Sequence, residues 1–163
     1  EVIDDALLQI RRLWQAGAAH RDVKPSNVLV QGSRVVLIDV SFGELRPSRW
    51  RQAVDLGNML LVLALAAGPA AVLERAETFF DRDELAEAFA ATSSLTVPRQ
   101  LRRMLDARED DLVAAFRDLL PTRPVVIVQR WSTRRVLLAA AAVGGVLLTV
   151  VLTVLNLRAG GLL

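Results

Sequence analysis

The first third of the chain changes its hydrophobic period twice. Residues 4–16 place apolar side chains at helical spacing and Gly17 follows as a stop, which predicts an amphipathic helix. Two β-branched apolar runs come next, over 28–30 and 35–38, and the polar residues 31–34 separate them. This pattern predicts a β-hairpin with a four-residue turn.

The rest of the first 120 residues carries only helical patterns. A strongly apolar stretch over 52–67 predicts a helix that ends before Gly68. Asp81 is followed three residues later by Glu84, the spacing of a capping box, and predicts the start of another helix. Further helices are predicted from near Pro98 and over 110–120. Because strands and helices do not alternate, we expect a mainly α fold with one small β-hairpin.

Residues 136–155 form an uncharged run rich in Val, Leu and Ala. A helix of that length rises about 30 Å, the thickness of a bilayer core, so the run predicts a transmembrane helix. The alternative is a buried helix of a soluble protein. Arginines are concentrated before the run, which places the preceding residues in the cytoplasm by the positive-inside tendency. They are Arg123, Arg130, Arg134 and Arg135, against Arg158 alone after it.

These segments predict four parts. Residues 1–120 form the folded domain, 121–135 a basic juxtamembrane linker, 136–155 the membrane helix and 156–163 a short tail. The expected location is a bacterial cell membrane, with the folded domain in the cytoplasm and the lipid bilayer as a partner. High alanine and arginine contents with a single lysine favour a bacterial origin of high GC content.

Composition excludes several classes of protein. Hydrophobic residues make up 53% of the chain and charged residues 23%, which excludes a disordered protein. The absence of cysteine excludes disulfide scaffolds and thiolate sites, and a single histidine excludes sites that need two imidazoles. The net charge of +2 divides into +5 over 121–163 and 15 − 18 = −3 over 1–120. The basic surplus is therefore confined to one short segment, and no nucleic-acid partner is expected.

The densest chemistry lies between the predicted first helix and the hairpin. Residues 20–27 read H-R-D-V-K-P-S-N, and Asp39 follows the second apolar run. This resembles the catalytic loop and the metal-binding aspartate of the protein kinase superfamily. The only lysine and the only histidine of the chain, Lys24 and His20, both lie in these eight residues. The alternative is a coincidental match in an ordinary loop.

The resemblance implies a role for each matching residue. Asp22 would orient the substrate hydroxyl or accept its proton, and Lys24 would lie beside the transferred phosphoryl group. Asn27 and Asp39 would hold magnesium with their side-chain oxygens. The implied cofactors are ATP and Mg²⁺, with Lys24, Asn27 and Asp39 as the cofactor-binding residues.

The chain also departs from the kinase pattern. Val40-Ser41 follows Asp39, and only 15 residues separate Asp39 from Asp55, too few for the usual activation segment. This shortening resembles the atypical RIO-like and lipopolysaccharide-kinase-like branches. The Asp55-Leu56-Gly57 run resembles the aspartate that opens the central helix of the kinase C-lobe, while the alternative is a plain helix N-cap.

The sequence has no glycine-rich phosphate loop, and Lys24 is its only lysine, so the lysine of a kinase N-lobe is missing as well. We therefore expect this chain to be the C-lobe of a longer protein and to be inactive alone. The expected function is ATP- and magnesium-dependent phosphoryl transfer to a hydroxyl-bearing protein or a membrane-associated substrate. One alternative is a membrane-bound pseudokinase module that binds nucleotide or a partner without catalysis. Another is a structural membrane anchor or part of a transporter.

Overall fold

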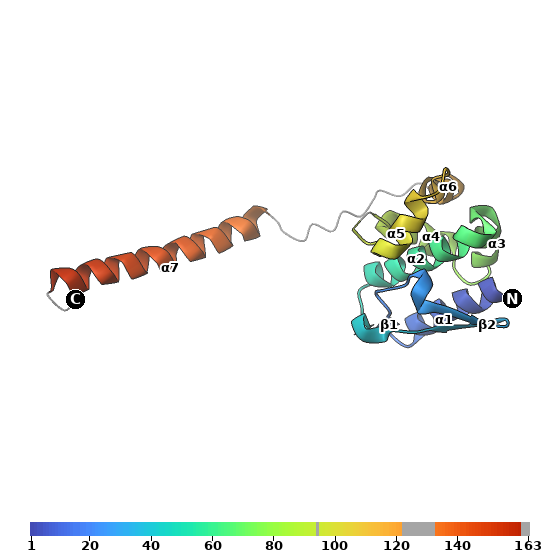
Figure 1. The fold of residues 1–163 in the computed structure, drawn as a ribbon, viewed down its shortest axis with the longest axis horizontal. Helices are drawn as coiled ribbons and strands as arrows, with labels where there is room; N and C mark the ends of the chain where they lie inside the picture. The colour runs from blue at the N-terminus through green and yellow to red at the C-terminus, as the bar shows by residue number, and fades with distance from the viewer. Residues whose placement is uncertain (94, 122–132, 161–163) are drawn as a thin grey trace. The chain divides into compact units, whose positions relative to one another are not determined.

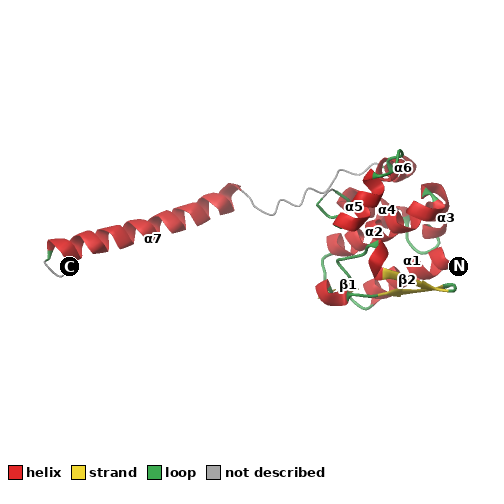
Figure 2. Cartoon of the chain, viewed as in Figure 1, coloured by secondary structure: helices red, strands yellow, loops and turns green. Residues whose placement is uncertain are grey.

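Helices dominate the computed structural model, which describes residues 1–93, 95–121 and 133–160 (Figures 1 and 2). The chain divides into two units, Glu1–Val126 and Ile127–Leu163. The helices of the first unit are α1 (Val2–Gln15), α2 (Arg49–Ala67), α3 (Pro69–Ala76), α4 (Arg82–Ala91), α5 (Arg99–Asp106) and α6 (Leu112–Leu119). Its strands are β1 (Ala18–Ala19), β2 (Val28–Gln31), β3 (Arg34–Leu37) and β4 (Glu44–Leu45). The predicted mainly α fold with a small β-hairpin is confirmed.

Helix α2 is the central element of the first unit. Ser48 caps its N-terminus by accepting the N–H of Arg51, and Gly68 ends it with a φ of 80°. Most of α2 between its ends is buried, and it packs against α1, α3 and α4. A Cβ atom at Gly57 would lie 2.5 Å from Thr92 Oγ1 and 2.9 Å from Ala88 O, so α4 approaches α2 closely at this glycine.

The predicted hairpin forms, but its turn is shorter than expected. Strands β2 and β3 pair antiparallel from Val28↔Leu37 to Gln31↔Arg34, which leaves only Gly32 and Ser33 in the turn. The prediction of a four-residue turn is wrong because Gln31 and Arg34 extend the strands as their last pair. A φ of 62° at Gly32 supplies the positive value that a two-residue hairpin turn needs.

A second strand pair joins the chain before the loop 20–27 to the chain after Asp39. Ala18 pairs with Leu45 and Ala19 with Glu44, and the Arg46 N–H donates to Gly17 O at 2.8 Å. Two-residue strands give no periodicity, so the sequence did not predict them. Their effect is to hold β4 beside the start of the loop 20–27.

The later helices largely follow the sequence signals. The capping box at α4 is confirmed: Asp81 accepts the Glu84 N–H at 2.7 Å, and Glu84 accepts the Asp81 N–H at 3.1 Å. Helices α5 and α6 lie at the expected places. Helix α3 was not predicted; Gly68 stops α2, but Pro69 is tolerated in the first turn of a new helix.

The prediction of a transmembrane helix over 136–155 is wrong. The segment does form a helix, α7 (Thr133–Ala159), and the hydroxyls of Thr149 and Thr153 donate to Gly145 O and Thr149 O. In the described parts of the chain, however, no helix is both long and apolar enough to cross a membrane. The prediction used the length of the uncharged run and its content of Val, Leu and Ala, and a helix that does not cross a membrane can share these properties. The predicted linker 121–135 lies almost wholly outside the described residues.

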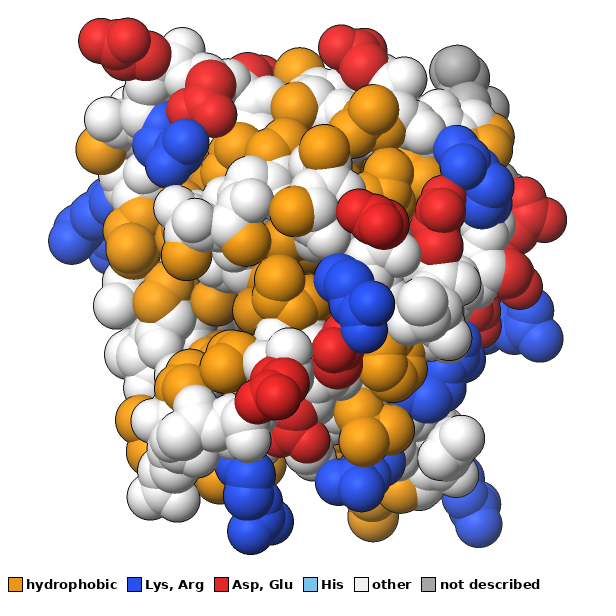
Figure 3. All heavy atoms as spheres, turned by 90° about the vertical axis from the view of Figure 1, so that its right-hand side faces the viewer, with side chains coloured by type: hydrophobic (Ala, Val, Ile, Leu, Met, Phe, Trp, Pro, Cys, Tyr) orange, Lys and Arg blue, Asp and Glu red, His pale blue; other side chains and the backbone are white. Residues whose placement is uncertain are grey.

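The surface carries charges of both signs. On the face shown in Figure 3, acidic and basic side chains are interspersed among hydrophobic ones. Several ion pairs link them, including Arg75 with Asp4 at 2.7 Å and Arg11 with Glu84 at 2.6 Å. Arg11 also stacks its guanidinium over Phe80, 4.1 Å from the ring centroid, and so ties α1 to the start of α4.

Candidate functional site

The loop 20–27 has a defined conformation that its sequence explains. Lys24 is extended, and Pro25 begins a short 3₁₀ turn, η1 (Pro25–Asn27), at the position where its missing N–H costs nothing. The Asn27 N–H donates to Lys24 O at 2.9 Å and closes this turn. The turn folds Lys24 and Asn27 back toward Asp22.

Asp22 is the residue on which the side chains of this loop converge. Its Oδ2 atom lies 2.5 Å from Lys24 Nζ and accepts a hydrogen bond from Asn27 Nδ2 at 3.1 Å. Asn27 Nδ2 also donates to the backbone oxygen of Asp22 at 2.9 Å. Within the described residues no hydrogen bond ends on Asp22 Oδ1, and the side chain is 15% exposed. Asp22 therefore has one carboxylate oxygen held by the loop and one available to a ligand.

His20 connects this loop to the end of the hairpin. The imidazole is buried, and its Nε2 lies 2.9 Å from Ile38 O. A carbonyl only accepts, so Nε2 carries the proton and Nδ1 accepts the Asp22 N–H at 3.4 Å. His20 thus ties the backbone of Asp22 to the residue immediately before Asp39.

Asp39 lies at the end of the hairpin in a strained backbone conformation. Its φ of 60° is left-handed, which aspartate tolerates better than most residues. Ser41 Oγ donates to Asp39 Oδ1 at 2.6 Å, and this hydrogen bond is the main cause of a lowered pKa of Asp39. The nearby charge of Lys24 lowers that pKa further. Asp39 is therefore an exposed, ionised carboxylate near the cationic end of Lys24.

Asp55 of helix α2 holds the backbone of the loop 20–27. It lies in the middle of α2, seven positions after the N-cap Ser48, so the N-cap alternative is excluded. Its carboxylate accepts the backbone N–H groups of His20 at 2.5 Å and Arg21 at 2.8 Å, and it is 1% exposed. Burial raises the pKa of Asp55 to about 6, against these hydrogen bonds, which lower it. The sequence pointed to Asp55 through the resemblance of the Asp55-Leu56-Gly57 run, and the structure shows which groups it holds.

The four predicted site residues lie at one end of the hairpin. Asn27 directly precedes β2 and Asp39 follows β3 by one residue, and the Ile38 N–H donates to Asn27 O at 3.0 Å. Asp22, Lys24 and Asn27 are in direct contact, whereas Asp39 is brought near them through Ile38 and His20. The loop and the hairpin end therefore form one site.

Two side-chain oxygens at this end of the hairpin are of the kind that binds a magnesium ion. Among the described residues, no three His, Asp or Glu side chains come together as a metal site. Mg²⁺ is usually bound by one or two protein oxygens with substrate phosphates and water supplying the rest. Asn27 donates with its amide nitrogen, which leaves Oδ1 with only the Ser26 hydroxyl at 3.3 Å, and Asp39 Oδ2 has no described partner. These two oxygens fit such an ion.

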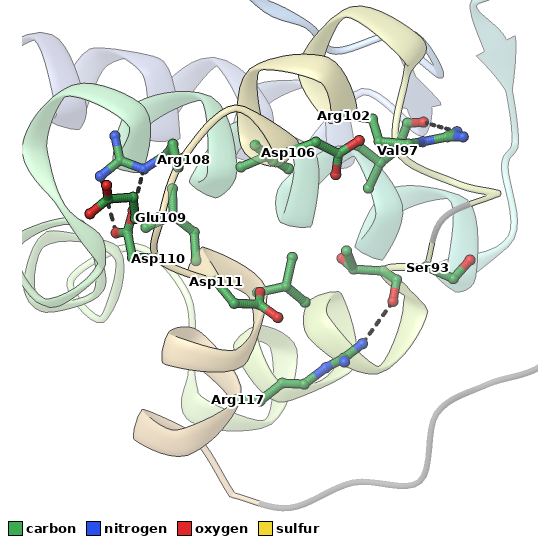
Figure 4. Close-up of a pocket in the computed structure, with 13 residues that line it drawn as sticks. Ser93, Val97, Arg102, Asp106, Arg108, Glu109, Asp110, Asp111 and Arg117 are labelled. Carbon is green, nitrogen blue, oxygen red and sulfur yellow. Dashed lines mark hydrogen bonds and ion pairs between the residues drawn. The ribbon is translucent and has the colours of Figure 1, made fainter.

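A cavity of about 420 Å³ lies elsewhere in the unit, between the residues after α4, the end of α5 and the start of α6 (Figure 4). None of the four site residues lines it. Its arginines are engaged within the fold: Arg117 donates to Thr92 O, Arg102 to Val97 O, and Arg108 pairs with Asp110 at 2.7 Å.

Compared with family models, curated proteins and solved structures, the chain matches none. Function is therefore inferred from the site itself. Sequence reasoning missed Ser41, whose hydroxyl holds Asp39, and Glu44, which contacts Arg21. The signal for Ser41 was its position two residues after an aspartate, a common spacing for local side-chain hydrogen bonds. No sequence signal near Glu44 indicated its contact with Arg21.

Proposed function

We propose that this chain is the catalytic-lobe part of an atypical Ser/Thr-kinase-like phosphotransferase, which transfers the γ-phosphoryl group of ATP to a hydroxyl. The arrangement around Asp22 supports this proposal most directly. Lys24 and Asn27 fix one oxygen of that carboxylate and leave the other to a ligand. Phosphoryl transfer needs an oriented base, a cation and oxygen ligands for magnesium, and Asp22, Lys24 and the oxygens of Asn27 and Asp39 are the residues that would supply them.

In this proposal Asp22 is the catalytic residue that orients the substrate hydroxyl, the nucleophile, and accepts its proton. The substrate hydroxyl donates to Asp22 Oδ1, and its oxygen bonds to the γ-phosphorus while the bond to the β-phosphate oxygen breaks. ADP leaves, and the hydroxyl proton passes to Asp22. Lys24 Nζ lies 2.5 Å from Asp22 Oδ2 and would place a positive charge beside the transferred group.

Asn27 and Asp39 would hold the magnesium ion. That ion, when bound, neutralises charge on the phosphate oxygens. Ser41 keeps Asp39 ionised through its hydrogen bond, and the left-handed backbone of Asp39 is strain of the kind that functional sites retain. Asn27 Nδ2 donates to Asp22, so the amide oxygen of Asn27 is the atom that would bind the ion.

The outer face of the hairpin supplies an apolar surface beside these residues. Leu29 and Val36 are opposite each other in the β2–β3 register, and they are 44% and 41% exposed. Leu29 lies two residues after Asn27 and Val36 three residues before Asp39. An apolar pair so close to the proposed metal ligands suits the flat face of a purine, which supports ATP as the nucleotide.

A nucleotide-binding module without catalysis is the second candidate. It is favoured by Ser41, which occupies one oxygen of Asp39, and by the 15 residues from Asp39 to Asp55, which leave no room for a peptide-docking segment. This candidate shares the nucleotide site and differs only in turnover.

The nucleotide site can be tested by titrating the full-length protein with ATP in the presence and absence of Mg²⁺. We expect magnesium to strengthen ATP binding, and Asp39→Asn to remove that dependence. Asp118→Asn, on the exposed side of α6, is the matched control and should bind as the wild type does. ATP binding that is equal with and without Mg²⁺ in the wild type would contradict the proposed site.

A further inference from the structure

Glu44 lies between two guanidinium groups beside the candidate site. Its Oε2 atom is 2.8 Å from Arg51 Nε and 3.4 Å from Arg21 Nε. Arg21 directly precedes Asp22 in the loop 20–27, and Arg51 lies in the first turn of α2. One carboxylate therefore connects three segments that are separate in sequence: the loop, β4 and α2.

The carboxylate of Glu44 is partly shielded, although the three side chains are each about a third exposed. The Oε2 atom is shielded from solvent and makes no hydrogen bond within the described residues. A desolvated carboxylate oxygen needs compensation, and the two guanidinium groups supply it. Without the negative charge, Arg21 and Arg51 would be neighbouring cations with nothing between them, and their repulsion would push Arg21 away.

Arg21 is held at both its backbone and its side chain. Its φ of 68° is left-handed, an uncommon conformation for a long side chain that needs support from its surroundings. Asp55 accepts its N–H at 2.8 Å, and Glu44 holds its guanidinium. Arg51 and Asp55 are four positions apart on α2 and so lie on the same side of that helix.

We propose that Glu44 is a positioning residue for Asp22. Its carboxylate, placed between Arg21 and Arg51, keeps the strained Arg21 backbone in the conformation that directs Asp22 to the site. The pairing of β4 with β1 holds Glu44 beside the start of the loop. An effect of Glu44 on catalysis by Asp22 rests on the proposed function. The restraint that Glu44 places on Arg21 does not depend on that function.

Hydrogen exchange of the Arg21 amide, measured by NMR on the full chain, tests the restraint directly. In Glu44→Gln we expect this amide to exchange roughly threefold to tenfold faster than in the wild type. Glu44→Asp, which keeps the charge, should restore most of the protection. Glu109→Gln removes an exposed glutamate away from the site and should leave the Arg21 amide unchanged.

Equal exchange of the Arg21 amide in wild type and Glu44→Gln would overturn the proposal. If Glu44→Gln unfolds, Arg21→Gln replaces it, because this change removes the same ion pair from the other side. The protection factor of the amide at position 21 should then fall, and an unchanged value would overturn the proposal. In the full-length protein, Glu44→Gln should lower kcat roughly tenfold with KM for ATP unchanged. If the wild-type protein transfers no phosphoryl group, that result contradicts the proposed function but not the role of Glu44. The hydrogen exchange of the Arg21 amide still decides whether Glu44 holds the loop.

Discussion

The carboxylate of Asp55 accepts the backbone N–H of Arg21 at 2.8 Å, although 34 positions separate these residues. The same carboxylate accepts the N–H of the preceding residue at 2.5 Å. The most buried acid of the central helix thus fixes the loop that carries the candidate base. The hydrophobic core and the site are therefore coupled through one carboxylate, and the core determines where the loop lies.

This burial predicts a pH dependence of stability that Asp55→Asn removes. The pKa of Asp55 is raised from 3.8 to about 6, so between these values the unfolded chain loses this proton before the folded one does. The contribution of Asp55 to stability is therefore full below pH 4 and declines as pH rises to about 6, by about 3 kcal/mol.

Urea unfolding at several pH values, followed by circular dichroism, measures this decline. The free energy of unfolding of the wild type, minus that of Asp55→Asn, should fall between pH 4 and pH 7. Asp118→Asn, an exposed aspartate, should follow the wild type throughout. Parallel curves for wild type and Asp55→Asn would mean that the proton of Asp55 is not linked to folding.

Ser41→Ala should raise the pKa of Asp39. The Ser41 hydroxyl, 2.6 Å from Asp39 Oδ1, is the largest cause of the lowered value, and alanine removes it. NMR titration of the Asp39 carboxyl carbon would follow the change, with Ser48→Ala as the control because Ser48 caps α2 and does not touch Asp39. An unchanged midpoint for Asp39 would show that the hydroxyl does not control its ionisation.

Gly57→Ala should destabilise the first unit. The new Cβ would lie 2.5 Å from Thr92 Oγ1 and 2.9 Å from Ala88 O, so α2 and α4 must separate. Overpacking of this kind costs about 1–3 kcal/mol. Thermal unfolding of the full chain would show it as a lower melting temperature of the first unit. Gly144→Ala, where nothing lies within 4 Å, should leave that transition in place.

Local signals in the sequence identified most elements, and contacts across long separations account for what was missed. The capping box of Asp81 and Glu84 was predictable because both partners lie in one helical turn. Helix α3 was missed because Gly68 and Pro69 look like an ending, although proline also suits a helix start. A helix over 136–155 was expected, and α7 (Thr133–Ala159) contains it, but the prediction that it spans a membrane was wrong.

The candidate site divides in the same way. Asp22, Lys24 and Asn27 lie within six residues, so the motif alone placed them together, and their contacts follow from the 3₁₀ turn at Pro25. The support from Asp55 remained open from the sequence because it depends on the packing of α2. Glu44 reaches Arg21 only through the β1–β4 pairing, which two-residue strands do not reveal.

The most direct test of the account is phosphoryl transfer from ATP by the full-length protein with Mg²⁺, comparing wild type with Asp22→Asn. Asparagine keeps the shape of Asp22 but cannot take the hydroxyl proton, so we expect turnover to fall by roughly 10²-fold or more. ATP binding should remain, and Asp118→Asn should be as active as the wild type. Equal transfer by wild type and Asp22→Asn would contradict the assignment of Asp22 as the catalytic base.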